Sequence, residues 1–196
     1  MMKPEFVMHK KTNKAARARG ASLLEVLVAI LILSFGMLAM AGLHSVAFKY
    51  GKMSQFRGVA TQLAADLADR MRANPEGAVN GGYVFMDVYD DSPDEVDLPA
   101  CGEEVACADA AAMAERDLAE VRRVIQTALP GGWLHVTQDP GVPPRTMYTV
   151  WILWQDPDAL GGAADGGTAS LAGQCPAAAV AGANPVPQCM PVRVAL

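Results

Sequence analysis

The chain has 196 residues, of which 52% are hydrophobic, and its formal net charge at pH 7 is −5. This length accommodates one domain with an anchor or leader in addition. The negative charge argues against a nucleic-acid-binding protein, because such proteins present a basic face to the phosphates.

Charge is distributed unevenly along the chain. Residues 1–20 contain six Lys or Arg and one acidic residue, whereas the remainder contains ten Lys or Arg and twenty acidic residues. The basic start is typical of a leader that stays in the cytoplasm beside a membrane span. The acidic remainder is typical of a soluble exported domain.

An apolar run with one carboxylate follows the basic leader. Residues 26–43 form a stretch of 18 residues without a charge, and as a helix it would span roughly 27 Å, close to the thickness of a bilayer core. Glu25 stands at its start. A carboxylate in such a helix costs about 2.5–3.5 kcal/mol on insertion scales, so it usually has a partner and a function.

Proteolysis can create that partner. If the chain is cut after Gly20, the new α-amine of Ala21 lies four residues from Glu25, or the amine of a neighbouring chain takes its place. Two alternatives compete: a secretory signal peptide cleaved after residues 39–41, and an uncleaved single-pass anchor. Neither explains an acid at the start of the apolar run.

The helix is expected to continue to about Asn74, where Pro75 disfavours helical geometry in the preceding residue. Leu63, Leu67 and Met71 recur at helical spacing and predict one buried face. The charged side chains between residues 66 and 72 are expected on the opposite, solvated side; they are Asp66, Asp69, Arg70 and Arg72.

The middle of the chain is expected to hold a strand, an acidic loop and a second helix. Residues 83–89 alternate as a strand does. The acidic residues of the loop at 90–97 are Asp90, Asp91, Asp94, Glu95 and Asp97; a solvated loop is favoured over a calcium site because EF-hand spacing is absent. The helix is predicted over 109–129, with Asp109 as N-cap and with Arg122 and Arg123 on a solvated surface.

The last third predicts the rest of a small sheet. Residues 133–137 and 146–155 are expected to be strands, the latter central because both of its faces are apolar. A long loop rich in Gly and Ala covers 156–188, and a short edge strand covers 190–196. His135 is interpreted as a strand residue and not as a ligand or base. The expected fold class is α+β.

Four cysteines, Cys101, Cys107, Cys175 and Cys189, suggest disulfides in an exported domain. Three pairings are possible, and the local one, Cys101–Cys107 with Cys175–Cys189, is favoured. Their spacing is not that of zinc ligands. No catalytic motif is present, so we expect a structural and interaction protein with no cofactor, and not an enzyme.

Residues 20–25, which read GASLLE before the apolar run, resemble the signal of type IV prepilins. The resemblance implies cleavage between Gly20 and Ala21 by a prepilin peptidase and N-methylation of Ala21, although the first mature residue of the family is usually Phe. Residues 68–74 resemble a segment of minor pilins of the PilV type. A cysteine-rich turn before a helix that ends in LPGG is similar to the same proteins.

The resemblance implies a pilin fold, in which a long N-terminal helix packs on a small antiparallel sheet, with one further helix. Residues 1–20 would be the cleaved leader, 21–48 the transmembrane or filament-core part of the helix, and 49–196 the periplasmic or extracellular head. The implied function is that of a minor pilin that primes pilus assembly near the tip. The alternatives are a minor pseudopilin of type II secretion and, less favoured, a membrane-anchored periplasmic binding protein.

The same resemblance implies the partners and the location. The partners would be the prepilin peptidase, other minor pilins and the major pilin, or pseudopilins, and the inner-membrane assembly platform. The protein would span the bacterial inner membrane once, with a periplasmic head, and would lie in the pilus after assembly. Neither nucleic acid nor a metal is expected to bind.

Overall fold

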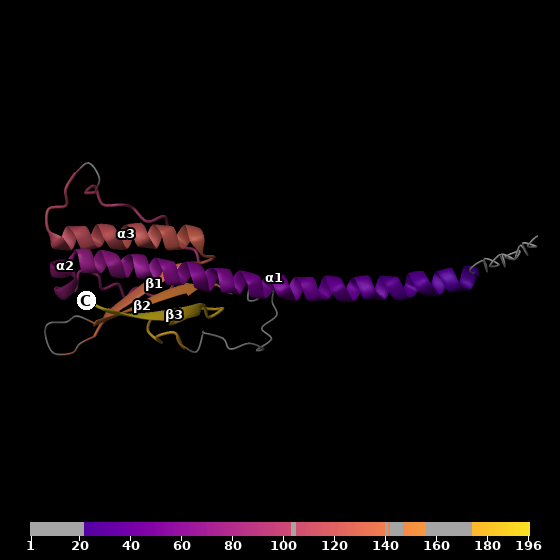
Figure 1. The fold of residues 1–196 in the computed structure, drawn as a ribbon. Coiled ribbons are helices and arrows are strands. Elements are labelled where there is room, and N and C mark those ends of the chain that lie inside the picture. The colour runs from indigo at the N-terminus through magenta and orange to yellow at the C-terminus, as the bar shows by residue number, and fades with distance from the viewer. Residues whose placement is uncertain (1–21, 103–104, 140, 142–146, 156–173) are drawn as a thin grey trace, which may run out of the picture. The chain divides into compact units, whose positions relative to one another are not determined.

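The computed structural model describes residues 22–102, 105–139, 141, 147–155 and 174–196. The fold is α+β, with the elements in the order α1 (Leu23–Ala73), α2 (Pro75–Val79), α3 (Ala110–Ala128), β1 (Trp133–Gln138), β2 (Met147–Trp154) and β3 (Gln188–Ala195) (Figure 1). The chain divides into two compact units, Met1–Val46 and Ala47–Leu196. The sheet, α2 and α3 belong to the second unit.

Helix α1 is 51 residues long and ends at Ala73, as the sequence predicted. A five-residue helix, α2, follows directly and was not expected. Asn74 caps it, because its side chain accepts a hydrogen bond from the backbone N–H of Gly77 at 3.2 Å, and Pro75 occupies the first turn. Asn followed by Pro is a typical start of a helix, so the signal was present in the sequence.

Helix α3 closely follows its prediction. Asp109 is its N-cap, and the Asp109 carboxylate accepts from the backbone N–H of Ala112 at 2.8 Å. At the other end, Leu129 leaves helical geometry and begins the turn that precedes β1. A side-chain acceptor at the N-cap satisfies one of the donors that every helix leaves unpaired.

The sheet is antiparallel, with the order β1-β2-β3. Ile152 of the central strand pairs with Leu134 of β1 and with Met190 of β3, which confirms β2 as the central strand. The strand predicted at residues 83–89 is wrong. Only Phe85 bridges to Val136, because beyond it the chain leaves the edge of β1 and the Tyr89 N–H bonds the carbonyl of Ala179 instead.

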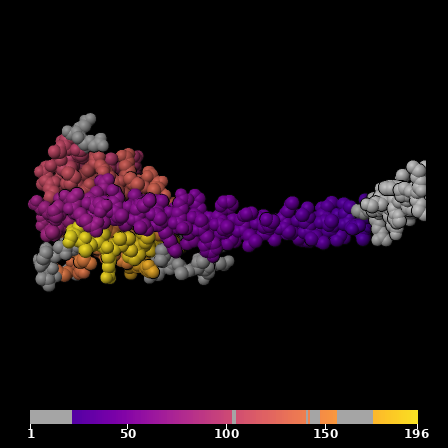
Figure 2. Space-filling view, in the orientation of Figure 1, coloured from indigo at the N-terminus to yellow at the C-terminus, as the bar shows by residue number. Residues whose placement is uncertain are grey.

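The main core lies between one face of the sheet and the helices. The later residues of α1 run beside α3, and both helices cover the sheet, with β3 on the far side of α1 from α3 in the view of Figures 1 and 2. The largest fully buried side chains of this core come from all these elements; they include Leu67, Met71, Tyr83, Ile125, Leu134, Tyr148, Ile152 and Trp154.

The opposite face of the sheet has a smaller core of its own. Trp133, Leu153 and Cys189 pack with Tyr89, and partly buried residues of the segment 175–183 cover them. The Tyr89 ring meets the Trp133 ring edge-on at 6.4 Å between centroids. Both faces of the sheet are therefore occupied, as the apolar pattern of β2 requires.

Candidate functional site

The first part of α1 is apolar on every side and exposed. A stretch of 18 residues in this helix is strongly apolar, and none of it is buried. By length and composition it is able to cross a membrane once. An apolar surface of this extent needs lipid or protein to cover it. Its exposed large side chains up to residue 35 are Leu23, Leu24, Val26, Leu27, Val28, Ile30, Leu31, Ile32, Leu33 and Phe35.

Glu25 is the third residue of α1, and Ser22 caps the helix before it. The backbone N–H of Glu25 donates to the Ser22 hydroxyl at 3.2 Å and to the Ser22 carbonyl at 3.0 Å. Ser followed by Glu three residues later is the capping-box pattern, a signal that is present in the sequence. A carboxylate in the first turn also interacts favourably with the helix dipole. The position of Glu25 therefore has a local structural use.

The predicted cleavage site, Gly20 and Ala21, lies outside the described residues. Cleavage, methylation and a pairing between the Ala21 amine and Glu25 stay predictions. Among the described residues, no lysine, arginine or histidine forms an ion pair with Glu25. The helix thus leaves one exposed carboxylate at the start of its apolar part, with its negative charge unmatched within the described chain.

A network of charged side chains joins α1 to α3. The Arg70 guanidinium donates to Asp66 at 3.1 Å, to Asp117 at 3.1 Å and to Glu120 at 2.7 Å. Asp117 is only 8% exposed, and it also accepts from the Tyr83 hydroxyl at 2.6 Å. The prediction that Arg70 lies on a solvated side is wrong, because the side of α1 that carries it faces α3.

The environment of this network shifts several pKa values. Burial opposes the charge of Arg70, but its hydrogen bonds to Glu120 and Asp117 outweigh burial and raise its pKa. Burial, and then the bond to Asp117, raises the pKa of Tyr83. The bond from Arg70 lowers the pKa of Glu120, against the effect of burial. These charges join the two helices within the second unit.

Arg122 also differs from its prediction. Its guanidinium lies 4.1 Å above the centroid of the Phe85 ring, and burial lowers its pKa. It is half-buried because the segment that follows Phe85 crosses the outer side of α3. The neighbouring Arg123 remains on the surface, where it pairs with Glu95.

Hydrogen bonds of its side chains and backbone hold the acidic loop at 90–97 within the second unit. The Asp90 carboxylate accepts from the N–H of Ser92 at 3.0 Å, and Asp91 accepts from the Gln155 side chain at 3.3 Å. The Gln126 amide donates to the carbonyl of Asp94. Within the described residues, no group of three His, Cys, Asp or Glu side chains is placed to hold a metal ion.

His135 lies in β1 opposite Trp151, on the face of the sheet that the smaller core covers. It is 2% exposed, and its Nδ1 has no hydrogen-bond partner in the described part of the chain. Burial lowers its pKa, so the neutral form is favoured. This is the environment of a packed strand residue.

The cysteines are paired locally in the structure. Cys101 is bonded to Cys107 and Cys175 to Cys189, and no free cysteine is found in the described residues. The first disulfide lies just before α3. The second links the turn at 175 to the start of β3, beside the smaller core.

Comparison of the chain with family models, with curated proteins and with solved structures finds no match. The resemblance to pilins thus depends on residues 20–25, on the apolar run and on the segments in the head. The architecture, a long N-terminal helix with one further helix and a three-stranded antiparallel sheet, is consistent with a pilin-like fold.

Proposed function

We propose that this protein is a minor pilin of a type IV pilus, of the PilV type. A prepilin peptidase would remove residues 1–20, and the mature chain, anchored by the first part of α1, would take part in priming the filament near its tip. It would act there as a structural subunit and not as an enzyme. The observation that carries the proposal is the single exposed carboxylate, Glu25, at the third position of an apolar helix.

Two properties of this segment support an assembly role. The apolar surface is uniform around the helix, so either lipid tails or the helices of other subunits can cover it. The Glu25 charge is unfavourable in either setting unless a cation meets it. A new α-amine, on this chain or on a neighbour, would meet it only after cleavage. The charge would thereby distinguish a docked subunit from a free one.

The second unit supports export. Two disulfides form between its cysteines, and such bonds persist in oxidising compartments. Its α+β architecture is that expected for the head of a pilin. The same features also fit a minor pseudopilin of type II secretion, because the prepilin signal and the apolar helix do not separate the two classes of protein. The identity of the neighbouring subunits is what separates these two functions.

The first test concerns processing. Gly20→Val is expected to leave a full-length precursor in the membrane, while the wild-type protein begins at Ala21, as mass spectrometry of the N-terminus will show. A wild-type protein that begins at Gly42 would indicate a secretory signal peptide. One that begins at Met1 would indicate an uncleaved anchor.

The second test separates the charge of Glu25 from its place in the helix cap. Glu25→Gln keeps a side chain that suits a capping box and removes the charge. We expect Glu25→Gln and Glu25→Ala to be processed but absent from sheared pili. Ser22→Ala is the matched control: it weakens the cap by about 1 kcal/mol, keeps the charge, and should still be assembled. Normal assembly of Glu25→Gln would refute the charge model.

The third test separates pilus from pseudopilus. Crosslinked neighbours, recovered from membranes and identified by mass spectrometry, are expected to be pilus subunits. Recovery of secretion pseudopilins instead, with secretion lost and piliation intact on deletion, would assign the chain to the secretion system.

A further inference from the structure

The part of α1 that follows the apolar run in the sequence carries positive charge. Lys49, Lys52 and Arg57 are all exposed, and they are three of the ten Lys or Arg that follow residue 20. Residues 26–57 contain no acidic residue, whereas residues 58–196 contain 19 acidic residues against 7 Lys or Arg. A chain that is strongly acidic beyond this point therefore has an uninterrupted cationic stretch on one helix.

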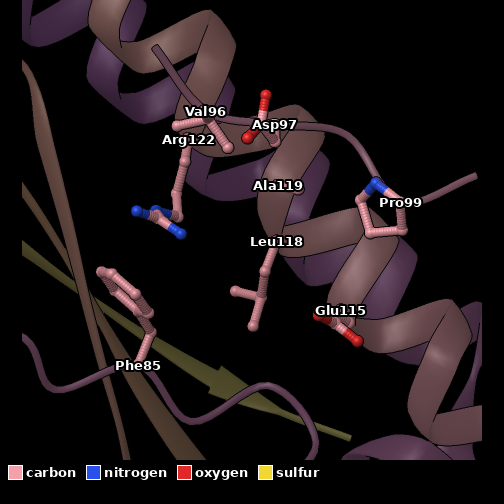
Figure 3. Close-up of a pocket in the computed structure, with 8 residues that line it drawn as sticks. All are labelled: Phe85, Val96, Asp97, Pro99, Glu115, Leu118, Ala119 and Arg122. Carbon is pink, nitrogen blue, oxygen red and sulfur yellow. The ribbon is translucent and has the colours of Figure 1, made fainter. Parts of the chain in front are cut away.

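The cations of this stretch lack the carboxylates that accompany the arginines of α3. Two arginines of α3 form ion pairs, and Arg122 lies in a pocket that Asp97 and Glu115 also line (Figure 3). In contrast, Lys52 donates to one neutral side-chain amide at 3.3 Å. Neither Lys52 nor Arg57 forms an ion pair with any residue that the structure describes. Their positive charge is available to a ligand from outside the chain.

Two exposed aromatic side chains accompany these cations. Phe48 and Tyr50 lie in the same stretch of α1, shortly before Lys52. Tyrosine gathers where the hydrocarbon of a bilayer meets its headgroups, and lysine extends its apolar stem so that the ammonium group reaches the polar layer. An acidic protein surface would match the charge alone, but a lipid surface matches both the charge and the aromatic residues.

The spacing along α1 indicates which cation meets the headgroups. A helix rises about 1.5 Å per residue, so Lys52 lies about 3 Å beyond Tyr50 along the axis and Arg57 about 10 Å beyond it. A headgroup layer is roughly 5–8 Å thick on each side of a bilayer. With Tyr50 at the inner edge of that layer, Lys52 lies among the phosphates and Arg57 lies at or past the outer limit.

We propose that residues 48–57 bind the phosphate groups of anionic phospholipids, with the Lys52 ammonium as the main contact and Tyr50 at the edge of the hydrocarbon. The partner is a headgroup with a net negative charge, and a zwitterionic headgroup binds more weakly. This inference rests on the membrane anchoring included in the proposed function, but on neither cleavage nor pilus assembly. Its failure would leave the tests of Gly20 and Glu25 unaffected.

The test uses the full chain in bilayer nanodiscs, one chain per disc, made of phosphatidylcholine with increasing fractions of phosphatidylglycerol. Binding is followed by the NMR signals of the Tyr50 and Lys52 backbone N–H groups. These signals should shift saturably in the wild type, because one cation at a bilayer surface favours an anionic lipid about fivefold. Raising the salt from about 0.1 M to about 1 M shortens the Debye length from about 10 Å to about 3 Å, and should abolish the preference.

Two variants check the residue. Lys52→Gln removes the charge and keeps a good helix former, so the half-saturating fraction of phosphatidylglycerol should rise about fivefold. Arg57→Gln is the matched control, because it removes one charge from the same helix at about one Debye length beyond Tyr50. Its half-saturating fraction should rise by less than about twofold.

Signals that do not respond to phosphatidylglycerol, or a response that Lys52→Gln leaves unchanged, would overturn the proposal while the anchor stands. A response seen only in discs that hold two chains would also overturn it, because an acidic surface of the second copy would then be the partner. A chain that enters neither kind of bilayer would refute the membrane anchoring as well. If Lys52→Gln does not fold, the salt dependence of the wild type still decides.

Discussion

Asp117 is predicted to be the residue of the charged network on which the second unit depends most. It is 8% exposed and accepts hydrogen bonds from the fully buried Tyr83 hydroxyl and from Arg70. Asp117→Ala removes the short bond of that hydroxyl, at a cost of about 1 kcal/mol because the hydroxyl keeps a longer bond to the Arg70 carbonyl at 3.3 Å, and it removes a charge-assisted bond of about 1.5–3 kcal/mol. Arg70 keeps Glu120 and Asp66, so we expect a total loss near the lower end, about 3 kcal/mol.

The assay is unfolding of the full chain in detergent micelles, followed by tryptophan fluorescence. All three tryptophans, Trp133, Trp151 and Trp154, lie in β1 and β2, so the signal reports on the second unit. For a unit of this size a loss of about 3 kcal/mol corresponds to a fall in Tm of roughly 6–12 °C.

Asp69→Ala is the matched control, since Asp69 also pairs with an arginine of α1, Arg72, but its side chain is 78% exposed. Exposed pairs contribute about 0–1 kcal/mol, so Tm should barely change. Tyr83→Phe combined with Asp117→Ala should cost less than the two single changes together, because both remove one bond. If Asp117→Ala lowers Tm no more than Asp69→Ala does, the network does not stabilise the unit and the reasoning fails.

Two further predictions concern acid pH and the disulfides. Because the pKa of Glu120 is lowered in the folded state, chiefly by Arg70, its stabilisation is present above the unfolded pKa of about 4.3 and is lost as pH falls through the folded value. The difference in urea midpoint between wild type and Glu120→Gln should therefore be constant above about pH 5 and shrink below about pH 4, whereas an unchanged difference at pH 3 would contradict the shift. The loss of folding stability that protonation of His135 causes at acid pH occurs in both proteins, so it cancels in this comparison. Replacing Cys175 and Cys189 by alanine opens a loop with a sequence separation of 14 and should lower the free energy of unfolding by about 3 kcal/mol. Replacing Cys101 and Cys107, with a separation of 6, should lower it by about 2 kcal/mol in the same fluorescence assay. The reverse order would refute the loop-length argument.

Periodicity predicted the long elements of this fold well because each has a strong local signal. Helix α1 has no proline before Pro75, α3 has both a cap and an apolar stripe, and the apolar faces of β2 indicated a central strand. Residues 83–89 have the alternation of side chains that a strand requires, but they do not form one. The segment leaves the edge of β1 after Phe85, so its later residues have no strand to pair with.

The charged residues were harder to place from sequence for a related reason. A periodic pattern assigns each helix one buried face, but α1 packs against both the sheet and α3. Arg70 lies on the side that faces α3, and Arg122 is half-buried because a distant segment crosses it. Neither contact can be predicted from the spacing of nearby residues, because each joins residues far apart in the sequence. The capping box at Ser22 and Glu25, in contrast, has a local sequence signal, Ser followed by Glu three residues later. The assembly role proposed for Glu25 is separate from this cap.

Arg70 and Glu25 are two charged residues of α1 that the described chain treats differently. Arg70 meets three carboxylates within the second unit, so its charge is balanced internally. Glu25 has its backbone N–H satisfied by Ser22, but no described cation pairs with its carboxylate. Under the proposed function, a cation from outside the described residues would meet this charge. Glu25→Gln is therefore the decisive variant, since it preserves the shape and the cap and removes only the charge that such a cation would meet.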